Sequence, residues 1–134
     1  MPNGVVDASA MIELFTAKNP AKDLRRRILV GDLVAPQLFD LEVAQVLRKL
    51  ALCGALADAD AYETLQEIRQ SPIYRCDHAP LLDRVWALRA AITAYDAVYV
   101  ALAEQFEVPL ITCDQRLANS NGHKARIELY PLST

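Results

Sequence analysis

The chain has 134 residues and a formal net charge of −3, which excludes a strongly basic protein that coats nucleic acid through charge alone. Its hydrophobic fraction of 53% and charged fraction of 23% are typical of a globular protein. We expect residues 1–134 to form a single domain with a substantial core. No apolar run is long enough to cross a bilayer and no signal segment is evident, so we expect a cytoplasmic protein without membrane association.

The cysteines and histidines give no pattern of a site. Cys53, Cys76 and Cys113 are odd in number and lack CxxC spacing, which indicates reduced thiols. Neither they nor His78 and His123 have zinc-ligand spacing. Cysteine or zinc chemistry is therefore not expected.

The first half of the chain alternates short apolar runs with helical patterns. It predicts strands over residues 4–7 and 33–35, and helices over 8–15, between Pro20 and Gly31, and over 39–52. Asp7 ends the first strand, with Ser9 close behind it at the turn into the helix. Glu42 lies at the margin of the apolar helix face formed within residues 39–52.

The second half continues the alternation. It predicts helices over residues 58–70 and 80–89 and from Thr93, and strands over 73–75, 109–112 and 127–130. The helix that starts at Thr93 has almost no polar face, so it should be buried, yet Asp96 lies in its first turn. Asp114 follows the next strand. Strands that alternate with helices predict an α/β fold with a parallel sheet, and ligands bind such sheets outside the carboxyl ends of the strands.

Four acids from four separate segments are the candidate site: Asp7, Glu42, Asp96 and Asp114. Each also has an ordinary explanation, since Asp7 and Asp114 could cap helices and Asp96 could complete a capping box with Thr93. One acidic cleft explains all four together. Neighbouring carboxylates raise one another's pKa values, and a divalent cation relieves that repulsion. Oxygen ligands alone favour Mg²⁺, with Mn²⁺ as an alternative, and this chemistry suits hydrolysis of a phosphodiester.

The same segments carry a family resemblance. They read VVDAS at residues 5–9, LEVAQVLRK at 41–49, TAYDAVYVALAE at 93–104 and LITCDQRL at 110–117. With these motifs the chain resembles the PIN-domain nucleases, and specifically the VapC-type toxins of VapBC toxin–antitoxin pairs. The likeness covers nearly the whole chain.

The resemblance implies a three-layer α/β/α sandwich with a short parallel sheet. It also implies a magnesium-dependent endoribonuclease that acts on RNA, forms a homodimer and is silenced by a cognate VapB-type antitoxin. Some relatives have a further acid soon after the fourth one, where this chain has Gln115 and Arg116. The residues to which the resemblance assigns a role are the metal-binding catalytic acids Asp7, Glu42, Asp96 and Asp114, supported by Ser9 and Thr112.

Three alternatives stay open from the sequence. One is a PIN-domain RNA-processing nuclease outside toxin–antitoxin biology. Another is a non-catalytic phosphoacceptor-like binding module, although Ala8 stands where such proteins have a second acid and no Lys follows the strand at 109–112. A haloacid dehalogenase-type hydrolase would need an Asp where Ser9 stands.

Two further expectations concern residues outside the motifs. Glu13, on the same helix as Ser9, has no motif position and is expected to lie outside the site. Partner surfaces are expected where apolar residues of peripheral helices remain exposed. The candidates are Ile12, Phe15, Tyr62, Leu65 and Ile68.

Overall fold

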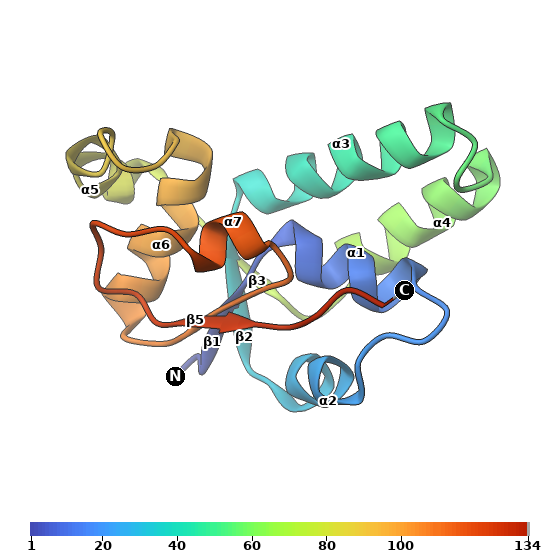
Figure 1. Cartoon of the computed structure of the whole chain (residues 1–134), viewed down its shortest axis with the longest axis horizontal. Coiled ribbons are helices and arrows are strands. Elements are labelled where there is room, and N and C mark those ends of the chain that lie inside the picture. The colour runs from blue at the N-terminus through green and yellow to red at the C-terminus, as the bar shows by residue number, and fades with distance from the viewer. Residues whose placement is uncertain (134) are drawn as a thin grey trace.

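The computed structural model describes residues 1–133 and is built on a five-stranded sheet (Figure 1). All neighbouring strands are parallel, in the order β3-β2-β1-β4-β5. In the register, Val5 lies opposite Val34 on one side and Leu110 on the other. The strands are β1 (Gly4–Val6), β2 (Leu33–Pro36), β3 (Tyr74–Cys76), β4 (Leu110–Thr112) and β5 (Ile127–Leu129).

The strand order determines where the helices lie. From β1 the chain moves through β2 to β3, and then returns past β1 to β4 and β5. Because parallel connections are right-handed, the helices before β3 and those between β3 and β4 cover opposite faces. The helices are α1 (Ala8–Thr16), α2 (Lys22–Val30), α3 (Leu38–Leu52), α4 (Asp58–Arg69), a 3-10 turn η1 (Ala79–Leu81), α5 (Leu82–Ala87), α6 (Ala94–Phe106) and α7 (Gln115–Ala118).

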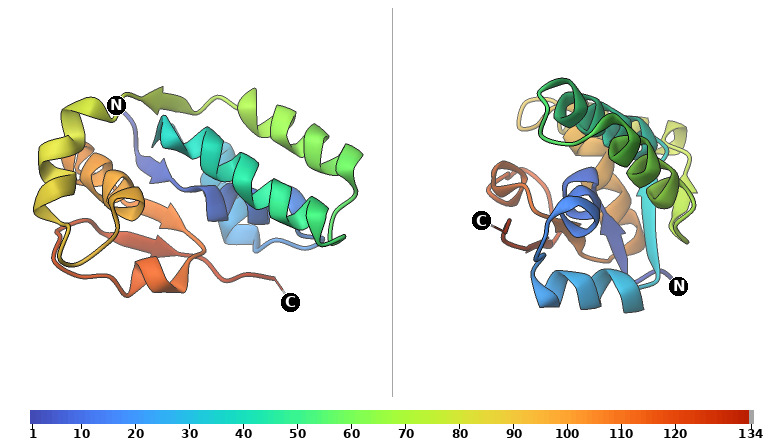
Figure 2. Two further views of the ribbon diagram at one scale, coloured as in Figure 1. Left: turned by 90° about the horizontal axis from the view of Figure 1, so that it is seen from above. Right: turned by 90° about the vertical axis from the view of Figure 1, so that its right-hand side faces the viewer.

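The packing agrees with this three-layer arrangement, an α/β/α sandwich as predicted. Helices α1, α3 and α4 contact one another, whereas α5 contacts α6. Figure 1 shows these two groups on opposite sides of the strands, and Figure 2 shows α3 and α4 running side by side. Within the described part of the chain, no helix combines the length and apolar character that a membrane crossing needs.

The core is formed by β1, β4 and α6. The strand residues from Gly4 to Val6 and from Leu110 to Thr112 are all buried, as are the residues of α6 from Ala97 to Ala103. This confirms the prediction that the helix starting at Thr93, which has almost no polar face, is buried. A helix buried on most sides holds its first turn firmly in place, and that turn contains Asp96.

Several apolar side chains lie elsewhere than the sequence pattern predicts. The helix expected over residues 80–89 is a 3-10 turn followed by α5. Its apolar pattern predicts that Leu82 faces inward together with Leu81, Val85 and Leu88, but Leu82 is 54% exposed. Ile12 and Ile68, expected as partner contacts, are buried within the monomer. Of that set Tyr62 is exposed and Phe15 and Leu65 are half-buried. A hollow lined mainly by apolar side chains is instead formed by α3, α5 and α6.

Candidate active site

The topology brings the four predicted acids to one edge of the sheet. Asp7 directly follows β1 and Asp114 lies two residues beyond β4, its neighbour in the sheet. The strand order reverses between these two strands, which is where open α/β sheets bind ligands. Glu42 comes from the beginning of α3 and Asp96 from the first turn of α6.

These acids line one cavity of about 340 Å³, which also contains a fifth carboxylate, that of Glu13. The placement of Glu13 contradicts the expectation that it lies outside the site. Glu13 is buried and accepts a hydrogen bond of 2.9 Å from the backbone N–H of Ser133. The other lining residues are Ala8, Ser9, Ile12, Thr16, Val46, Tyr99, Arg116, Leu117 and Leu132.

Asp7 is held by hydrogen bonds on both carboxylate oxygens. Oδ1 accepts from the Ser9 hydroxyl at 2.7 Å and from the backbone N–H of Ala10 at 3.0 Å. Oδ2 accepts from the hydroxyl of Thr112, at the end of β4. The hydroxyls in turn accept backbone N–H groups, Ser9 from Cys113 and Thr112 from Asp114, both at 2.9 Å. Ser9 and Thr112 therefore contact Asp7 directly and tie the ends of β1 and β4 together.

Burial disfavours the ionised form of two acids in this site, Asp7 and Glu42. Burial raises the pKa of Asp7 to about 6, against the lowering effect of the hydrogen bonds from Thr112, Ser9 and Ala10, and the charge of Asp114 adds to the rise. The pKa of Glu42 is raised as well, first by burial and then by the charges of Asp7 and Asp96. The charges of neighbouring acids thus contribute to both raised pKa values, as expected for carboxylates that line one cavity.

A cation from the chain itself bridges two of the acids. Arg116, in α7, donates from Nη1 to Asp96 Oδ2 at 2.6 Å and from Nη2 to Asp114 Oδ2 at 3.0 Å. Its own backbone N–H donates to Asp114 Oδ1 at 2.9 Å. Hydrogen bonding to Asp96 is the main cause of a raised pKa for Arg116. The guanidinium thus lies where the sequence analysis places a metal ion.

Two of the three capping roles considered from the sequence are present, whereas the capping box of Thr93 and Asp96 is only half formed among the described residues. Asp7 caps α1, Thr93 caps α6 by accepting from the N–H of Asp96, and Asp114 caps α7. A cap and a ligand are compatible roles, because a carboxylate has more lone pairs than one helix end uses. Capping fixes these acids at the mouths of their helices, facing the cavity.

The donor chemistry of the cavity fits a divalent cation. It consists of carboxylate oxygens without a competing thiolate or imidazole, which suits Mg²⁺ or Mn²⁺. Among residues 1–133, however, no three acidic, histidine or cysteine side chains converge closely enough to hold an ion together. Arg116 binds the carboxylates of Asp96 and Asp114 in this cavity. These acids would hold an ion after Arg116 has moved.

Tyr99 is a cavity residue that the acidic motifs did not reveal. Its side chain is 2% exposed, and its hydroxyl has no hydrogen-bond partner within the described chain. Burial and, next, the charge of Glu42 raise the pKa of Tyr99, so the hydroxyl keeps its proton and remains a donor. The hydroxyl acts on Glu42 and lowers the pKa of that group, without reaching the geometry of a formed hydrogen bond.

Spacing could have indicated two of the residues that sequence reasoning missed. Tyr99 follows Asp96 by three residues and Glu13 follows Ser9 by four, and such pairs share a helix face. The role of Arg116 could not be found in this way, because its partner Asp96 is 20 residues away in sequence.

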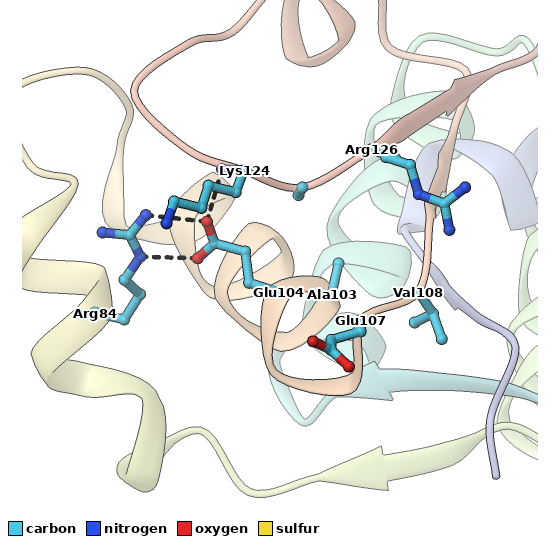
Figure 3. Close-up of a pocket in the computed structure, with 8 residues that line it drawn as sticks. Arg84, Ala103, Glu104, Glu107, Val108, Lys124 and Arg126 are labelled. Carbon is cyan, nitrogen blue, oxygen red and sulfur yellow. Dashed lines mark hydrogen bonds and ion pairs between the residues drawn. The ribbon is translucent and has the colours of Figure 1, made fainter.

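A larger cavity of about 530 Å³ lies at the other edge of the sheet, where β4 and β5 begin (Figure 3). There Arg84 and Glu104 form two parallel hydrogen bonds of 2.8 and 3.0 Å, and the backbone N–H of Lys124 also donates to Glu104. Glu104 is paired with Arg84 there, and none of the motif acids lines this cavity. We therefore assign the chemistry to the smaller cavity.

Comparison with known proteins agrees with this fold and motif set. Residues 4–122 match the PIN domain family. Ribonuclease VapC12 of Mycobacterium tuberculosis is 38% identical over 125 residues, which cover 93% of this chain and 97% of that protein. The solved structure of PAE2754 from Pyrobaculum aerophilum has a TM-score of 0.73 at 26% identity, over 94% of this chain and 83% of that one.

A further solved structure, DNA-bound VapBC from Salmonella typhimurium, has a TM-score of 0.71 at 14% identity, over 96% of this chain and 98% of that one, and supports the fold alone. The chain therefore belongs to the PIN-domain family. Within this family it is a VapC-type protein, because its similarity to VapC ribonucleases extends over nearly its whole length. The family resemblance predicted from the motifs is confirmed.

Proposed function

We propose that this chain is a Mg²⁺-dependent endoribonuclease, able to use Mn²⁺, and the toxin of a VapBC toxin–antitoxin pair. It acts in the cytoplasm as a single nuclease domain over residues 1–134. The observation that carries the proposal is the meeting of four motif carboxylates in one cavity, in a chain similar to VapC ribonucleases. The relatives reported above are VapC ribonucleases, which supports this function over the phosphoacceptor and dehalogenase alternatives.

Asp7, Glu42, Asp96 and Asp114 would hold the metal. A bound divalent ion lowers the pKa of water and neutralises charge that develops on a phosphodiester during hydrolysis. The protein contributes a ligand, Asp7, whose two oxygens are already oriented by Ser9, Ala10 and Thr112. Such supporting hydrogen bonds fix the direction and charge of a metal ligand.

The apolar part of the cavity has a separate role. Ile12, Val46, Leu117 and Leu132 line it beside the acids. Apolar walls lower the local dielectric and so strengthen every interaction between the carboxylates, a cation and a phosphate. The RNA strand would approach from the open side, where Arg116 is exposed.

The proposal includes a homodimer and a VapB-type antitoxin as partners. An apolar hollow of about 450 Å³, formed by α3, α5 and α6, is rimmed by exposed Leu41, Leu82 and Tyr95. Apolar surface of this kind is typical of an interface. Leu41 and Tyr95 directly precede Glu42 and Asp96, so a partner on this surface would border the catalytic cavity.

Cleavage of total RNA by the purified chain, with Mg²⁺ or Mn²⁺ and with EDTA, tests the activity. Asp114→Asn should reduce cleavage about a hundredfold or more, and adding Asp7→Asn should cost little further, because groups that act as a unit are non-additive. Glu63→Gln, exposed on α4, is the matched control. Metal-independent cleavage, or a Glu63→Gln variant as inactive as Asp114→Asn, would refute this site.

The toxin role is tested separately from the chemistry. Co-expression with the product of an adjacent small gene should yield a stable complex that no longer cleaves RNA. An active nuclease without such a partner would indicate the alternative, a PIN-domain RNA-processing enzyme outside toxin–antitoxin biology.

A further inference from the structure

Arg116 combines two properties that a simple structural ion pair does not need. Its guanidinium bonds to both Asp96 and Asp114, yet its side chain is 66% exposed, whereas those of Asp96 and Asp114 are 15% and 32% exposed. The arginine therefore lies across the mouth of the cavity with the acids behind it. Surface ion pairs contribute little to stability, so fold stability is a weak reason for this arrangement.

The two bonds use the carboxylate oxygens that a metal would need. Nη1 donates to Oδ2 of Asp96, and Nη2 donates to Oδ2 of Asp114. The other oxygen of Asp114, Oδ1, caps α7. A guanidinium and a divalent cation at these oxygens repel each other and compete for the same lone pairs. Binding of one therefore weakens binding of the other.

The side chain of Arg116 borders a second hollow besides the acidic cavity. Arg116 lines this hollow of about 430 Å³ together with Thr93, Ser120 and a second arginine, Arg89. The guanidinium of Arg89 lies over the ring of Trp86 and donates to the carbonyl of that residue. Moving the guanidinium from one hollow to the other needs rotation of an exposed side chain and leaves α7 in place. From there the guanidinium still lies beside the mouth of the cavity.

We propose that Arg116 is an exchangeable cation: it neutralises Asp96 and Asp114 in the metal-free chain, and binds an RNA phosphate once a divalent ion has replaced it. The inference rests on the proposed nuclease function. A planar guanidinium matches the oxygens of a phosphodiester as well as those of carboxylates. The exchange makes the arginine available to substrate only when the metal is bound, which couples the two binding steps.

The first experiment measures metal binding without RNA. The midpoint of thermal unfolding is followed as MnCl₂ is added to the wild type, Arg116→Ala, Arg116→Lys and the control Arg126→Ala, which lies at the opposite edge of the sheet. Arg116→Ala should show the same rise in the unfolding midpoint at about tenfold lower Mn²⁺, because the competing cation is gone. Arg116→Lys, which keeps the charge without the two-pronged geometry, should be intermediate, and Arg126→Ala unchanged.

The second experiment measures steady-state cleavage of a single-stranded RNA at saturating Mn²⁺. Arg116→Ala should raise KM about tenfold or more, with a smaller change in kcat, and Arg116→Lys should recover part of the loss. Tighter metal binding together with weaker RNA binding is a combination that a purely structural arginine would not produce.

The outcomes separate this inference from the proposed function. If the wild type and Arg116→Ala respond to Mn²⁺ at the same concentration, or if Arg116→Ala needs more, the exchange is refuted while the nuclease can stand. An unchanged KM refutes it as well. If neither protein is stabilised by Mn²⁺, both the exchange and the metal site fail. If Arg116→Ala alone responds, the arginine blocks the site in the wild type, and the exchange is refuted.

Discussion

The hydroxyl of Thr112 donates a hydrogen bond to Oδ2 of Asp7, and thereby joins two residues 105 positions apart in sequence. Thr112 is fully buried at the end of β4, and Asp7 is 6% exposed just beyond β1. The same hydroxyl accepts from the backbone N–H of Asp114. One side chain thus links both strand-end acids of the site.

Thr112→Val should therefore weaken the fold more than an ordinary conservative change. Valine has a similar shape but leaves Oδ2 of Asp7 without its donor, and lost hydrogen bonds to charged groups cost about 1.5–3 kcal/mol. Urea unfolding at pH 7 measures the loss. Thr64→Val, at a half-buried position of α4, is the control and should change the free energy of unfolding by less than about 0.5 kcal/mol. Equal effects in both variants would argue against the role of Thr112.

The raised pKa of Asp7 predicts a pH dependence of stability in the metal-free chain. A rise from 3.8 to about 6 corresponds to about 3 kcal/mol. Because the folded state binds the proton more tightly than the unfolded state, this stability is present below pH 4 and is lost as the pH rises through 6. The chain without metal should therefore be less stable at pH 7 than a variant that has no charge at this position.

Asp7→Asn tests that dependence directly. In EDTA the variant should unfold at higher urea concentration than the wild type at pH 7, and the difference should disappear near pH 4. Asparagine keeps an acceptor for the Ser9 hydroxyl and the N–H of Ala10, so the cap of α1 survives. A difference that does not change between pH 4 and pH 8 would contradict the assigned pKa.

The hydroxyl of Tyr99 has no hydrogen-bond partner among residues 1–133, which gives one prediction for stability and another for cleavage. A buried polar group without a partner costs about 1–3 kcal/mol, so Tyr99→Phe should stabilise the metal-free chain by about 1 kcal/mol. The same change removes the donor that acts on Glu42 and should lower RNA cleavage. Urea unfolding and cleavage rates are measured on the same preparations. Tyr95→Phe, exposed on the same helix, should change neither, and a Tyr99→Phe variant with unaltered cleavage would make this tyrosine a packing residue alone.

Much of the fold follows from local pattern. The strand ends at Asp7 and before Asp114, the stop at Gly31 and the buried helix after Thr93 all depend on neighbouring residues. The meeting of the acids then follows from the parallel sheet, since strands of one direction present their ends at one edge. This is why four acids scattered over 108 positions could be predicted to line one cavity.

What the sequence did not reveal depends on tertiary orientation. Periodicity could not distinguish Leu81, which is buried, from Leu82, which is exposed, because a 3-10 turn precedes α5 and changes the face that each residue presents. Ile12 and Ile68 have partners in the monomer that only the packing of α1, α3 and α4 creates. The bridge from Arg116 to Asp96 likewise depends on how α7 and α6 face each other.

The apolar surface on α3, α5 and α6 leads to a last prediction, on self-association. We expect the isolated chain to sediment as a homodimer at micromolar concentration, with Leu41, Leu82 and Tyr95 at the interface. Leu82 is 54% exposed at the rim of the hollow, so Leu82→Glu adds no buried charge to the monomer but would place one in the dimer, where unpaired charge is strongly unfavourable. The variant should sediment as a folded monomer. Leu29→Glu, at a side chain 67% exposed on α2, should remain dimeric. A wild type that stays monomeric, or a Leu29→Glu variant that dissociates while Leu82→Glu does not, would remove this surface from consideration and leave the nuclease site as it is.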